Sequence, residues 1–250
     1  MNGALGTLAK RKIRTGLLIQ DPTNRYIAAI LSQCDLSGKD ILEIGCGKGR
    51  ITRDLASHAR HVVATDPDVN VLGVARATIS FRNIDFMEAS TGIPDLSDGS
   101  FDVVIYTLSL HHVPIAAMSD SLNKAADLLK NDGVIIVLEP GDKGSFTLAK
   151  EQFGAGSGDE GPAKAAAIEA MHTLSGWDVG ETHHFYTQFQ FDSYEDFFTN
   201  MLPDFRQQPD DFISEVKTYL YLHRTVNGFV LDAERRLNIL RRNNQQQQFK

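Results

Sequence analysis

Three glycines and an upstream carboxylate, near residue 45, could together hold a nucleotide-like ligand. The segment Glu43-x-Gly45-x-Gly47-x-Gly49 follows a short apolar run, Ile41–Ile44, and leads into residues that favour a helix. Glycine tolerates a positive φ and lets a ligand approach the main chain closely. A strand–turn–helix corner at this point would therefore present backbone N–H groups. The pattern predicts a binding site for a cofactor that contains a nucleoside.

A second carboxylate, Asp66, stands where a ribose could be bound. It ends another apolar run, Val62–Thr65. A carboxylate at the strand end beside a glycine turn can accept hydrogen bonds from both ribose hydroxyls. The alternative is that Asp66 fixes a turn before Pro67, since Asp-Pro-Asp is good turn sequence.

Nicotinamide dinucleotides use the same architecture with the spacing Gly-x-Gly-x-x-Gly. The third glycine of that pattern would fall at position 50, where this chain has Arg50. An arginine side chain there would stand where the helix and strand of a dinucleotide corner pack closely. The observed spacing, with Glu43 upstream, favours a single nucleoside attached to an amino acid.

Short apolar runs alternate with helix-like segments between residues 40 and 139. The strands we expect are Ile41–Ile44, Val62–Thr65, Ile84–Met87, Val103–Tyr106 and Val134–Leu138. The helices we expect are Arg50–His58, Asn70–Thr78 and Ser119–Leu129, the last closed by a turn at 130–133. Strands that are apolar throughout and separated by helices predict an α/β fold with a doubly wound, Rossmann-like, mostly parallel sheet. Such sheets bind ligands at the carboxyl ends of their strands.

The rest of the chain is expected to surround this core, which we place at residues 36–142. An N-terminal helical segment covers 1–35, with a break at residues 21–24. The part from 143 to 250 contributes a lid, cap helices and the last strands of the same sheet. Its expected elements are a glycine-rich hinged lid at 154–162, helices at 163–174, 194–201 and 211–223, an antiparallel strand within 177–191, and a final strand at 234–241 that also fits a helix.

Composition narrows the possible partners. The chain has 250 residues, of which 42% are hydrophobic, an ordinary share for a globular protein. Its formal net charge of −7 disfavours a broad nucleic-acid surface. The basic cluster of Lys10, Arg11, Lys12 and Arg14 is expected to be a solvated helix face. We expect no membrane span and no secretory signal. With only two cysteines, we expect a cytoplasmic protein, as a monomer or homodimer.

With these motifs in order, the chain resembles a class I S-adenosylmethionine-dependent methyltransferase of the broad small-molecule group called type 11. The resemblance covers roughly residues 35–140 and rests on four motifs. These are the loop from Glu43 to Gly49, Asp66 ending the second strand, Glu88-Ala89 after the third, and Ser100–Ile105 leading to Leu110-His111-His112-Val113.

The resemblance implies a cofactor, S-adenosylmethionine, with S-adenosylhomocysteine as product, and a set of contacts. The loop residues Glu43, Gly45, Cys46, Gly47 and Gly49 would form the site for the methionine portion. Asp66 would hold the ribose, and Glu88 or Ala89 would contact the adenine amino group. Tyr106, Thr107 and Leu108 would line the sulfonium end. Many relatives have Gly-Asp-Ala where this chain has Met87-Glu88-Ala89, which leaves the adenine contact open.

Methyl transfer needs a base only if the acceptor arrives protonated. The candidates are His111 and His112, just beyond the fourth strand, because imidazole titrates near neutral pH. Either histidine could instead cap or pack against the next helix. Glu139, at the end of the fifth strand, could orient a substrate amine or hydroxyl, or only accept backbone N–H bonds. The spacing of carboxylates and histidines gives no support for a metal site.

We expect the N-terminal helices and residues 143–233 to form the acceptor pocket. Six aromatic residues could form its apolar wall or could pack in a helical core: Phe146, Phe153, Tyr194, Phe197, Phe198 and Phe205. The function expected is methylation of a small, partly hydrophobic molecule at oxygen, nitrogen or carbon. The alternatives are a non-catalytic S-adenosylmethionine-binding partner protein and an NAD-dependent oxidoreductase. Nucleic acid is a less favoured acceptor because the chain is acidic.

Overall fold

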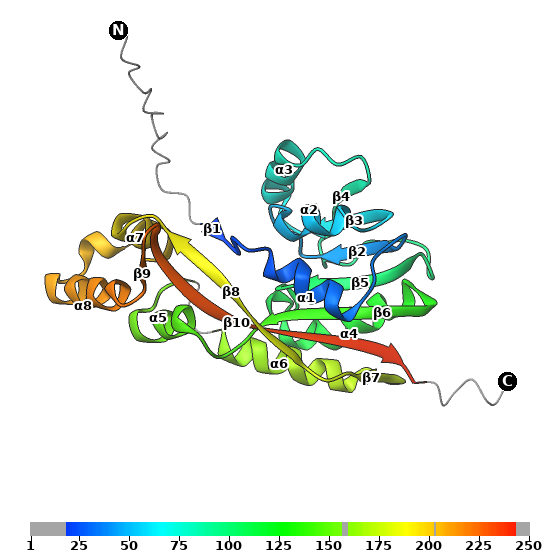
Figure 1. Cartoon of the computed structure of the whole chain (residues 1–250). Helices are drawn as coiled ribbons and strands as arrows, with labels where there is room; N and C mark the ends of the chain where they lie inside the picture. The colour runs from blue at the N-terminus through cyan, green and yellow to red at the C-terminus, as the bar shows by residue number, and fades with distance from the viewer. Residues whose placement is uncertain (1–18, 157–159, 203, 244–250) are drawn as a thin grey trace, which may run out of the picture.

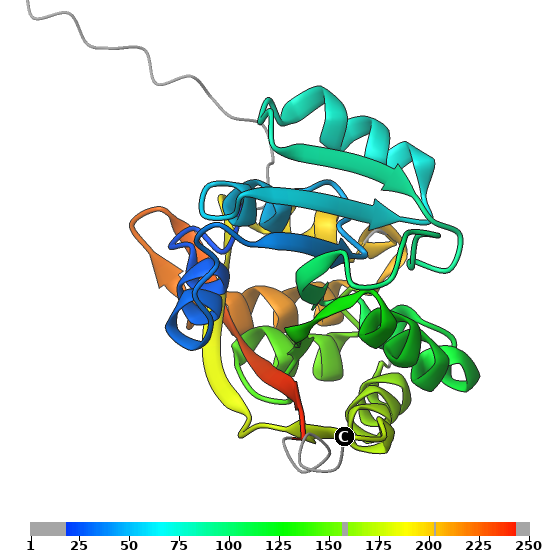
Figure 2. The same cartoon turned by 90° about the vertical axis from the view of Figure 1, so that its right-hand side faces the viewer.

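The computed structural model of this protein describes residues 19–156, 160–202 and 204–243. The basic cluster (Lys10, Arg11, Lys12 and Arg14), the expected helix over the first 18 residues and residues 244–250 lie outside these ranges. Within the described residues the strands form one ten-stranded sheet, with helices on both faces (Figures 1 and 2). In the same part of the chain, no helix is both long and apolar enough to cross a bilayer.

Five parallel strands form the core of the sheet, in the order β4-β3-β2-β5-β6. They are β2 (Asp40–Ile44), β3 (His61–Asp66), β4 (Ile84–Glu88), β5 (Phe101–Thr107) and β6 (Leu129–Pro140). The connections between them contain α2 (Arg50–Ala56), α3 (Val69–Thr78) and α4 (Met118–Asp127). The predicted doubly wound parallel sheet is confirmed.

Both faces of the core are covered, which explains why its strands are apolar at successive positions. One face packs against α1 (Arg25–Gln33), α2 and α3, and the other packs against α4 and α6 (Gly161–Thr173). Ile41 and Leu42 point to opposite faces, and each has an exposed fraction of 0%. Because neither face meets water, the period of two that marks a half-buried strand is missing from the sequence.

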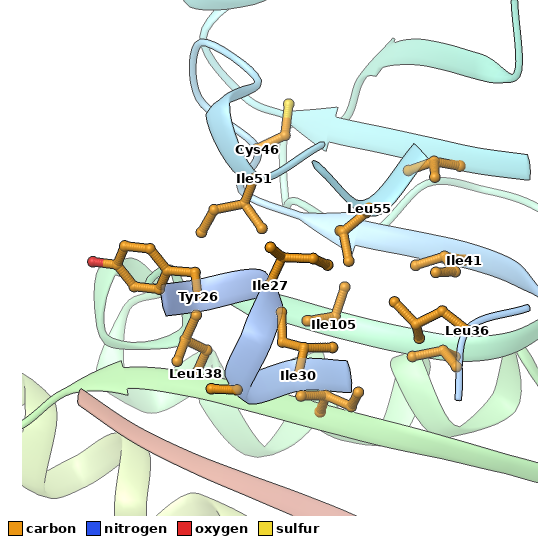
Figure 3. Close-up of a cluster of buried hydrophobic side chains, with 14 of the residues drawn as sticks. Tyr26, Ile27, Ile30, Leu36, Ile41, Cys46, Ile51, Leu55, Ile105 and Leu138 are labelled. Carbon is orange, nitrogen blue, oxygen red and sulfur yellow. The ribbon is translucent and has the colours of Figure 1, made fainter. Parts of the chain in front are cut away.

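Helix α1 is packed onto the first face of the sheet through Tyr26, Ile27 and Ile30. Figure 3 shows these side chains beside Ile51 of α2 and Ile105 of β5, with the phenol oxygen of Tyr26 directed away from the cluster. The three α1 side chains are 8% exposed or less, so the ring of Tyr26 is buried in this cluster while its hydroxyl group lies outside it.

The start of α1 is fixed by Asp21, which has a φ of 51° and a buried carboxylate. One carboxylate oxygen accepts the N–H of Arg25 at 2.9 Å and the other accepts the N–H of Tyr26 at 3.0 Å. The N–H of Asp21 donates to the carbonyl of Gln188 at 2.7 Å. Asp21 therefore satisfies helix N–H groups that have no intrahelical partner and ties α1 to the sheet.

The sheet continues beyond its parallel core through β10 (Gly228–Arg242). This strand lies between β6 and β8 (His183–Phe191) and is antiparallel to both, so β8 runs in the same direction as the core strands. Three short strands pair with β8 or β10: β1 (Ile19–Gln20), β7 (Trp177–Val179) and β9 (Arg224–Thr225). The predicted antiparallel final strand is confirmed, and it is longer than the expected Glu234–Arg241.

The far ends of β8 and β10 project past the core and support a helical cap (Figure 1). Helices α5 (Ser145–Phe153), α7 (Tyr194–Met201) and α8 (Asp210–Tyr221) pack around them through a separate buried cluster. Along β8, Phe189 and Phe191 are buried while Tyr186 is 43% exposed, so one face of the strand is turned to the cap. Three short 3₁₀ turns complete the described elements: η1 (Leu110–His112), η2 (Ile115–Ala117) and η3 (Phe205–Gln207).

Two local expectations are wrong. The turn predicted at residues 130–133 lies inside β6, where Leu129 pairs with Phe101 and the register with β5 then shifts. The polar run Lys130–Gly133 can stay in the strand because this end of β6 is partly exposed and the irregular register absorbs it. In the N-terminal segment expected to be helical, Ile19–Gln20 instead forms β1, because its backbone pairs with β8.

Candidate active site

The glycine corner lies between the end of β2 and the start of α2, as the sequence predicted. Gly45 has a φ of 74°, and a Cβ atom there would lie 2.3 Å from Cβ of Ser109. Gly47 has a φ of 54°, and a Cβ atom there would meet nothing within 4 Å. Gly45 is thus required by close packing within the protein, whereas Gly47 borders open space that a ligand could fill.

A cavity of about 510 Å³ opens at this corner. Its lining residues are Gln20, Gly45, Cys46, Gly47, Lys48, Arg50, Ile51 and Thr107. Gly49 does not line it, because that residue packs toward Ile79 and Ala75 of the next crossover. Glu43 does not line the cavity and has an exposed fraction of 0%.

The carboxylate of Glu43 is only partly satisfied. Oε1 accepts a hydrogen bond from Oγ1 of Thr107 at 2.8 Å, whereas Oε2 has no partner among the described residues. Burial raises the pKa of Glu43 to about 7, against the opposing effects of the hydroxyls of Thr52 and Thr107 and the charge of Arg50. Thr107 lines the cavity, so the unpartnered carboxyl atom next to it is a candidate acceptor for a cationic ligand group.

Asp66 lies beside the glycine corner because β3 pairs with β2 up to Thr65. Its carboxylate accepts the N–H of Gly47 at 2.8 Å and the N–H of Asp68 at 2.9 Å. Glu88 pairs with Asp66 across β3 and β4, and the N–H of Ala89 donates to the carbonyl of Asp66 at 3.3 Å. The structure therefore brings Asp66, Glu88 and Ala89 to one edge, next to the corner.

A second, larger cavity of about 830 Å³ lies between the core and the cap. It adjoins the first cavity, since Gln20 lines both and the consecutive residues Thr107 and Leu108 line one each. Leu108 has a φ of 60°, which is costly for a non-glycine residue and is a common feature of functional sites. The two cavities together provide adjacent places for a cofactor and a second molecule.

His111 and Glu139 meet at the second cavity. Nδ1 of His111 lies 2.5 Å from Oε2 of Glu139, and both side chains are 3% exposed. Oε1 of Glu139 accepts the N–H of Leu110 at 3.0 Å. Glu139 thus accepts a backbone N–H bond, which was one of the two roles considered from the sequence, and its other oxygen contacts His111. With Nδ1 engaged, Nε2 of His111 is left for chemistry in the cavity it lines.

His112 also lines this cavity, and its ring centroid lies 4.0 Å from that of His111. Desolvation lowers the pKa of His112, and the neighbouring His111 lowers it further. The imidazole of His112 is exposed and has no carboxylate at hydrogen-bond distance among the described residues. Of the two candidate bases, His111 is the one held in a fixed orientation.

The aromatic residues named from the sequence divide between the cavity and the core. Phe146 lines the second cavity and stacks on Phe189, with ring centroids 4.0 Å apart. The other five do not line the cavity and pack in the cap cluster, to which Phe146 also belongs: Phe153, Tyr194, Phe197, Phe198 and Phe205. Tyr106 was expected at the sulfonium end, but it is 0% exposed and bonds Ser121 at 2.8 Å in the opposite face of the core.

Several residues that line the second cavity were not named from the sequence. They are Gln20, Tyr26, Lys150, Lys164, Phe189 and Arg235. Arg235 could have been found from the sequence, because it is the one charged residue among the alternate positions Phe229, Leu231, Ala233, Arg235, Leu237 and Ile239. The others become site residues only through the way β1, α1 and the cap are folded onto the sheet.

Comparison with known proteins agrees with this geometry. Residues 41–133 match the family model described as a methyltransferase domain. A ubiquinone biosynthesis O-methyltransferase of Aromatoleum aromaticum is 33% identical over 40% of this chain and 43% of its own length. An uncharacterized methyltransferase of Staphylococcus carnosus is 31% identical over 40% of this chain and 46% of its own. The chain thus spans less than half the length of these curated relatives.

The fold extends the likeness beyond the matched region. A solved structure from Bacillus halodurans C-125, provisionally named a methyltransferase, has a TM-score of 0.56 at 17% identity. The match covers 88% of this chain and 98% of that one. At this identity the likeness shows the fold alone. The motifs, the family model over residues 41–133 and the fold all agree with a class I S-adenosylmethionine-dependent methyltransferase.

The cofactor of this family is S-adenosylmethionine, and the corner residues fit it. Gly47 leaves open space where a ligand could contact the main chain. The unpartnered Oε2 of Glu43 suits an ammonium group, and Lys48 and Arg50 in the lining suit a carboxylate. Arg50 lies over the ring of Tyr26, 4.5 Å from its centroid, and has no carboxylate partner among the described residues.

Proposed function

We propose that this protein transfers the methyl group of S-adenosylmethionine to a small, partly apolar molecule bound in the second cavity. The observation that carries the proposal is the buried pair of His111 and Glu139, which lines a cavity adjoining the cofactor corner. The name of the Aromatoleum relative, a ubiquinone biosynthesis O-methyltransferase, supports oxygen as the attacked atom. The comparisons offer no support for a dinucleotide oxidoreductase or a non-catalytic partner.

The cofactor would be held by the residues of the first corner. We assign the methionine portion to Gly45, Cys46 and Gly47, with Glu43 facing its ammonium and Arg50 its carboxylate. Gly49 would shape the corner from behind. Asp66 would accept the ribose hydroxyls, and Glu88 or Ala89 would lie at the adenine. Thr107 and Leu108 would stand at the sulfonium, where the two cavities meet.

When bound, S-adenosylmethionine would supply an electrophilic methyl group on its sulfonium. As the acceptor takes the methyl group, the electrons of the broken carbon–sulfur bond would stay on sulfur. The protein's contribution is to align the acceptor and exclude water. Nε2 of His111 would take the proton that a hydroxyl acceptor loses, while Glu139 holds the imidazole in one tautomer and orientation. His112 would contact the acceptor without this support.

Incubation of the protein with methyl-labelled S-adenosylmethionine and fractionated small-molecule pools tests the proposal. Mass spectrometry should find a product heavier by one labelled methyl group, together with S-adenosylhomocysteine. His111→Ala should form less of that product at unchanged cofactor affinity. Tight cofactor binding without a labelled product from any pool would instead identify a non-catalytic binding protein.

A further inference from the structure

Arg235 is a buried guanidinium that faces the second cavity from the middle of β10. It has an exposed fraction of 6%. Its strand neighbours on the same face are apolar: Ala233 belongs to the cap cluster and Leu237 to the core cluster. Arg235 therefore lies where these two apolar clusters meet, at a position that packing alone would fill with an aliphatic side chain.

The internal contacts of Arg235 orient it without neutralising it. Its Nε donates to the phenol oxygen of Tyr26 at 2.7 Å, and Nη1 donates to the carbonyl of Glu234 at 3.1 Å. The guanidinium carbon lies 5.5 Å from the ring centroid of Phe189. Within the described residues Nη2 has no hydrogen-bond partner, and no carboxylate lies at ion-pair distance.

The two lysine side chains that line this cavity do have carboxylate partners. Nζ of Lys150 lies 2.9 Å from Oε2 of Glu160, and Nζ of Lys164 lies 3.4 Å from Oδ1 of Asp142. A buried charge is costly unless an opposite charge and hydrogen bonds compensate it. For Arg235 that compensation is missing from the described chain and can come from a molecule in the cavity.

We propose that Arg235 binds the carboxylate of an aromatic monocarboxylic acid that carries a hydroxyl group, and that this acid is the acceptor. The acid's role as methyl acceptor rests on the proposed transfer function, whereas the binding of its carboxylate by Arg235 does not. The stacked rings of Phe146 and Phe189 offer an apolar wall beside the guanidinium, which suits an arene. His111, on the same cavity, would face the hydroxyl.

A single negative charge fits this cavity better than a phosphate dianion. Three acidic residues already line it, namely Asp142, Glu151 and Glu160, and only one cation is left without a carboxylate partner in the described chain. The fork of a guanidinium also matches a carboxylate through two parallel hydrogen bonds. The cofactor's own carboxylate has a separate cation, Arg50, which lines the corner cavity.

Calorimetry on the complex with S-adenosylhomocysteine tests the assignment. The probes are the three isomeric hydroxybenzoates, their uncharged amides and phenyl phosphate. At least one acid should bind about tenfold or more tightly than its amide. Arg235→Gln should reduce that ratio to near one while the affinity for S-adenosylhomocysteine stays within about twofold. Arg235→Lys should keep part of the preference, because it keeps the charge but loses the fork.

Two further variants guard against a general loss of structure. Lys164→Gln removes a paired cation of the same cavity and should leave the acid-to-amide ratio within about twofold. Tyr26→Phe keeps the guanidinium but removes its phenol partner, and should lower the ratio less than Arg235→Gln. Circular dichroism melts would show that each variant is folded under the conditions of the titration.

Several outcomes would overturn the proposal. They are the absence of saturable binding by all three acids, a preference for acids that survives in folded Arg235→Gln, and tighter binding of phenyl phosphate than of any acid. A parallel fall in S-adenosylhomocysteine affinity would assign Arg235 to the cofactor instead. If an acid binds through Arg235 but is never methylated, the anion site stands and the assignment of that acid as the acceptor is overturned.

Discussion

Thr107, at the end of β5, donates a hydrogen bond to the buried carboxylate of Glu43, at 2.8 Å. The bond crosses from one parallel strand to the next, because Glu43 and Ile105 are register partners. It satisfies one carboxylate oxygen and leaves Oε2 unpartnered beneath the cofactor corner. A hydrogen bond between residues 64 apart in sequence thus lowers the pKa of the buried carboxylate of Glu43, against the larger effect of burial.

The raised pKa of Glu43 has a consequence for stability. Its pKa is about 7 in the folded chain, against 4.5 for an ordinary glutamate. The folded state therefore holds a proton that the unfolded state has released between these values. The stabilisation from this group is complete below pH 4.5 and is lost as the pH rises to about 7.

Glu43→Gln should remove this dependence, since an amide does not titrate. We expect the variant to exceed the wild type in free energy of unfolding at pH 8 by up to about 3 kcal/mol, and the difference to shrink toward pH 5. Urea denaturation at pH 5, 6.5 and 8 without cofactor measures this difference. A constant difference across that range would mean that Glu43 does not titrate there.

The pair of His111 and Glu139 predicts a division between binding and turnover. His111→Ala should lower kcat about 10²- to 10⁴-fold on a hydroxyl acceptor, with the Kd for S-adenosylhomocysteine within about twofold. Steady-state kinetics measure the fall in kcat, and calorimetry with S-adenosylhomocysteine measures the Kd.

Glu139 is a positioning residue in this account, and its effect should pass through His111. Glu139→Gln should lower kcat at least about tenfold without changing the KM for S-adenosylmethionine, and should add little in the His111→Ala background. Independent, additive losses in the double variant would show that Glu139 acts by another route.

The two glycines at the corner predict opposite outcomes for the same substitution. Gly45→Ala would place a Cβ atom 2.3 Å from that of Ser109, so we expect a loss of about 2–4 kcal/mol in the free energy of unfolding. Gly47→Ala meets nothing within 4 Å and should cost only about 1–2 kcal/mol, for its positive φ.

For cofactor binding we expect the opposite order: relative to its loss of stability, Gly47→Ala should lose more S-adenosylhomocysteine affinity than Gly45→Ala. The methyl group of Gly47→Ala would enter the cavity, so S-adenosylhomocysteine affinity should fall at least about tenfold although the protein remains folded. Thermal melts followed by calorimetry at a temperature where both variants are folded separate the two effects. Unchanged affinity in Gly47→Ala would place the ligand away from this corner.

The elements of the core were predictable because their signals are local. Runs such as Ile41–Ile44 and Val103–Tyr106 are apolar and short, with helix-compatible residues between them, and the structure has strands at both places. The turn at Lys130–Gly133 was mispredicted for the same reason: its local sequence favours a turn, while its pairing beside β5 keeps it in the strand.

The acceptor side of the site depends on contacts that no local pattern contains. Arg235 reaches the cavity because β10 inserts between β6 and β8, which sets it opposite Pro140 on one side and Phe185 on the other. Tyr26 reaches Arg235 across 209 residues of sequence. The sequence predicted His111 and Glu139 at the same edge of the sheet, but not their contact, which the turn at Leu110–His112 creates.

Titration of S-adenosylhomocysteine into wild type, Asp66→Ala and Asp68→Ala tests most directly whether the glycine corner between β2 and α2, with Asp66 of β3 beside it, is the S-adenosylmethionine site. Asp68 is the matched control, because its carboxylate caps α3 through the N–H of Asn70. We predict one-to-one binding by the wild type, affinity weaker by about 1–3 kcal/mol in Asp66→Ala, and little change in Asp68→Ala. No binding by the wild type, or equal affinity in all three proteins, would contradict it.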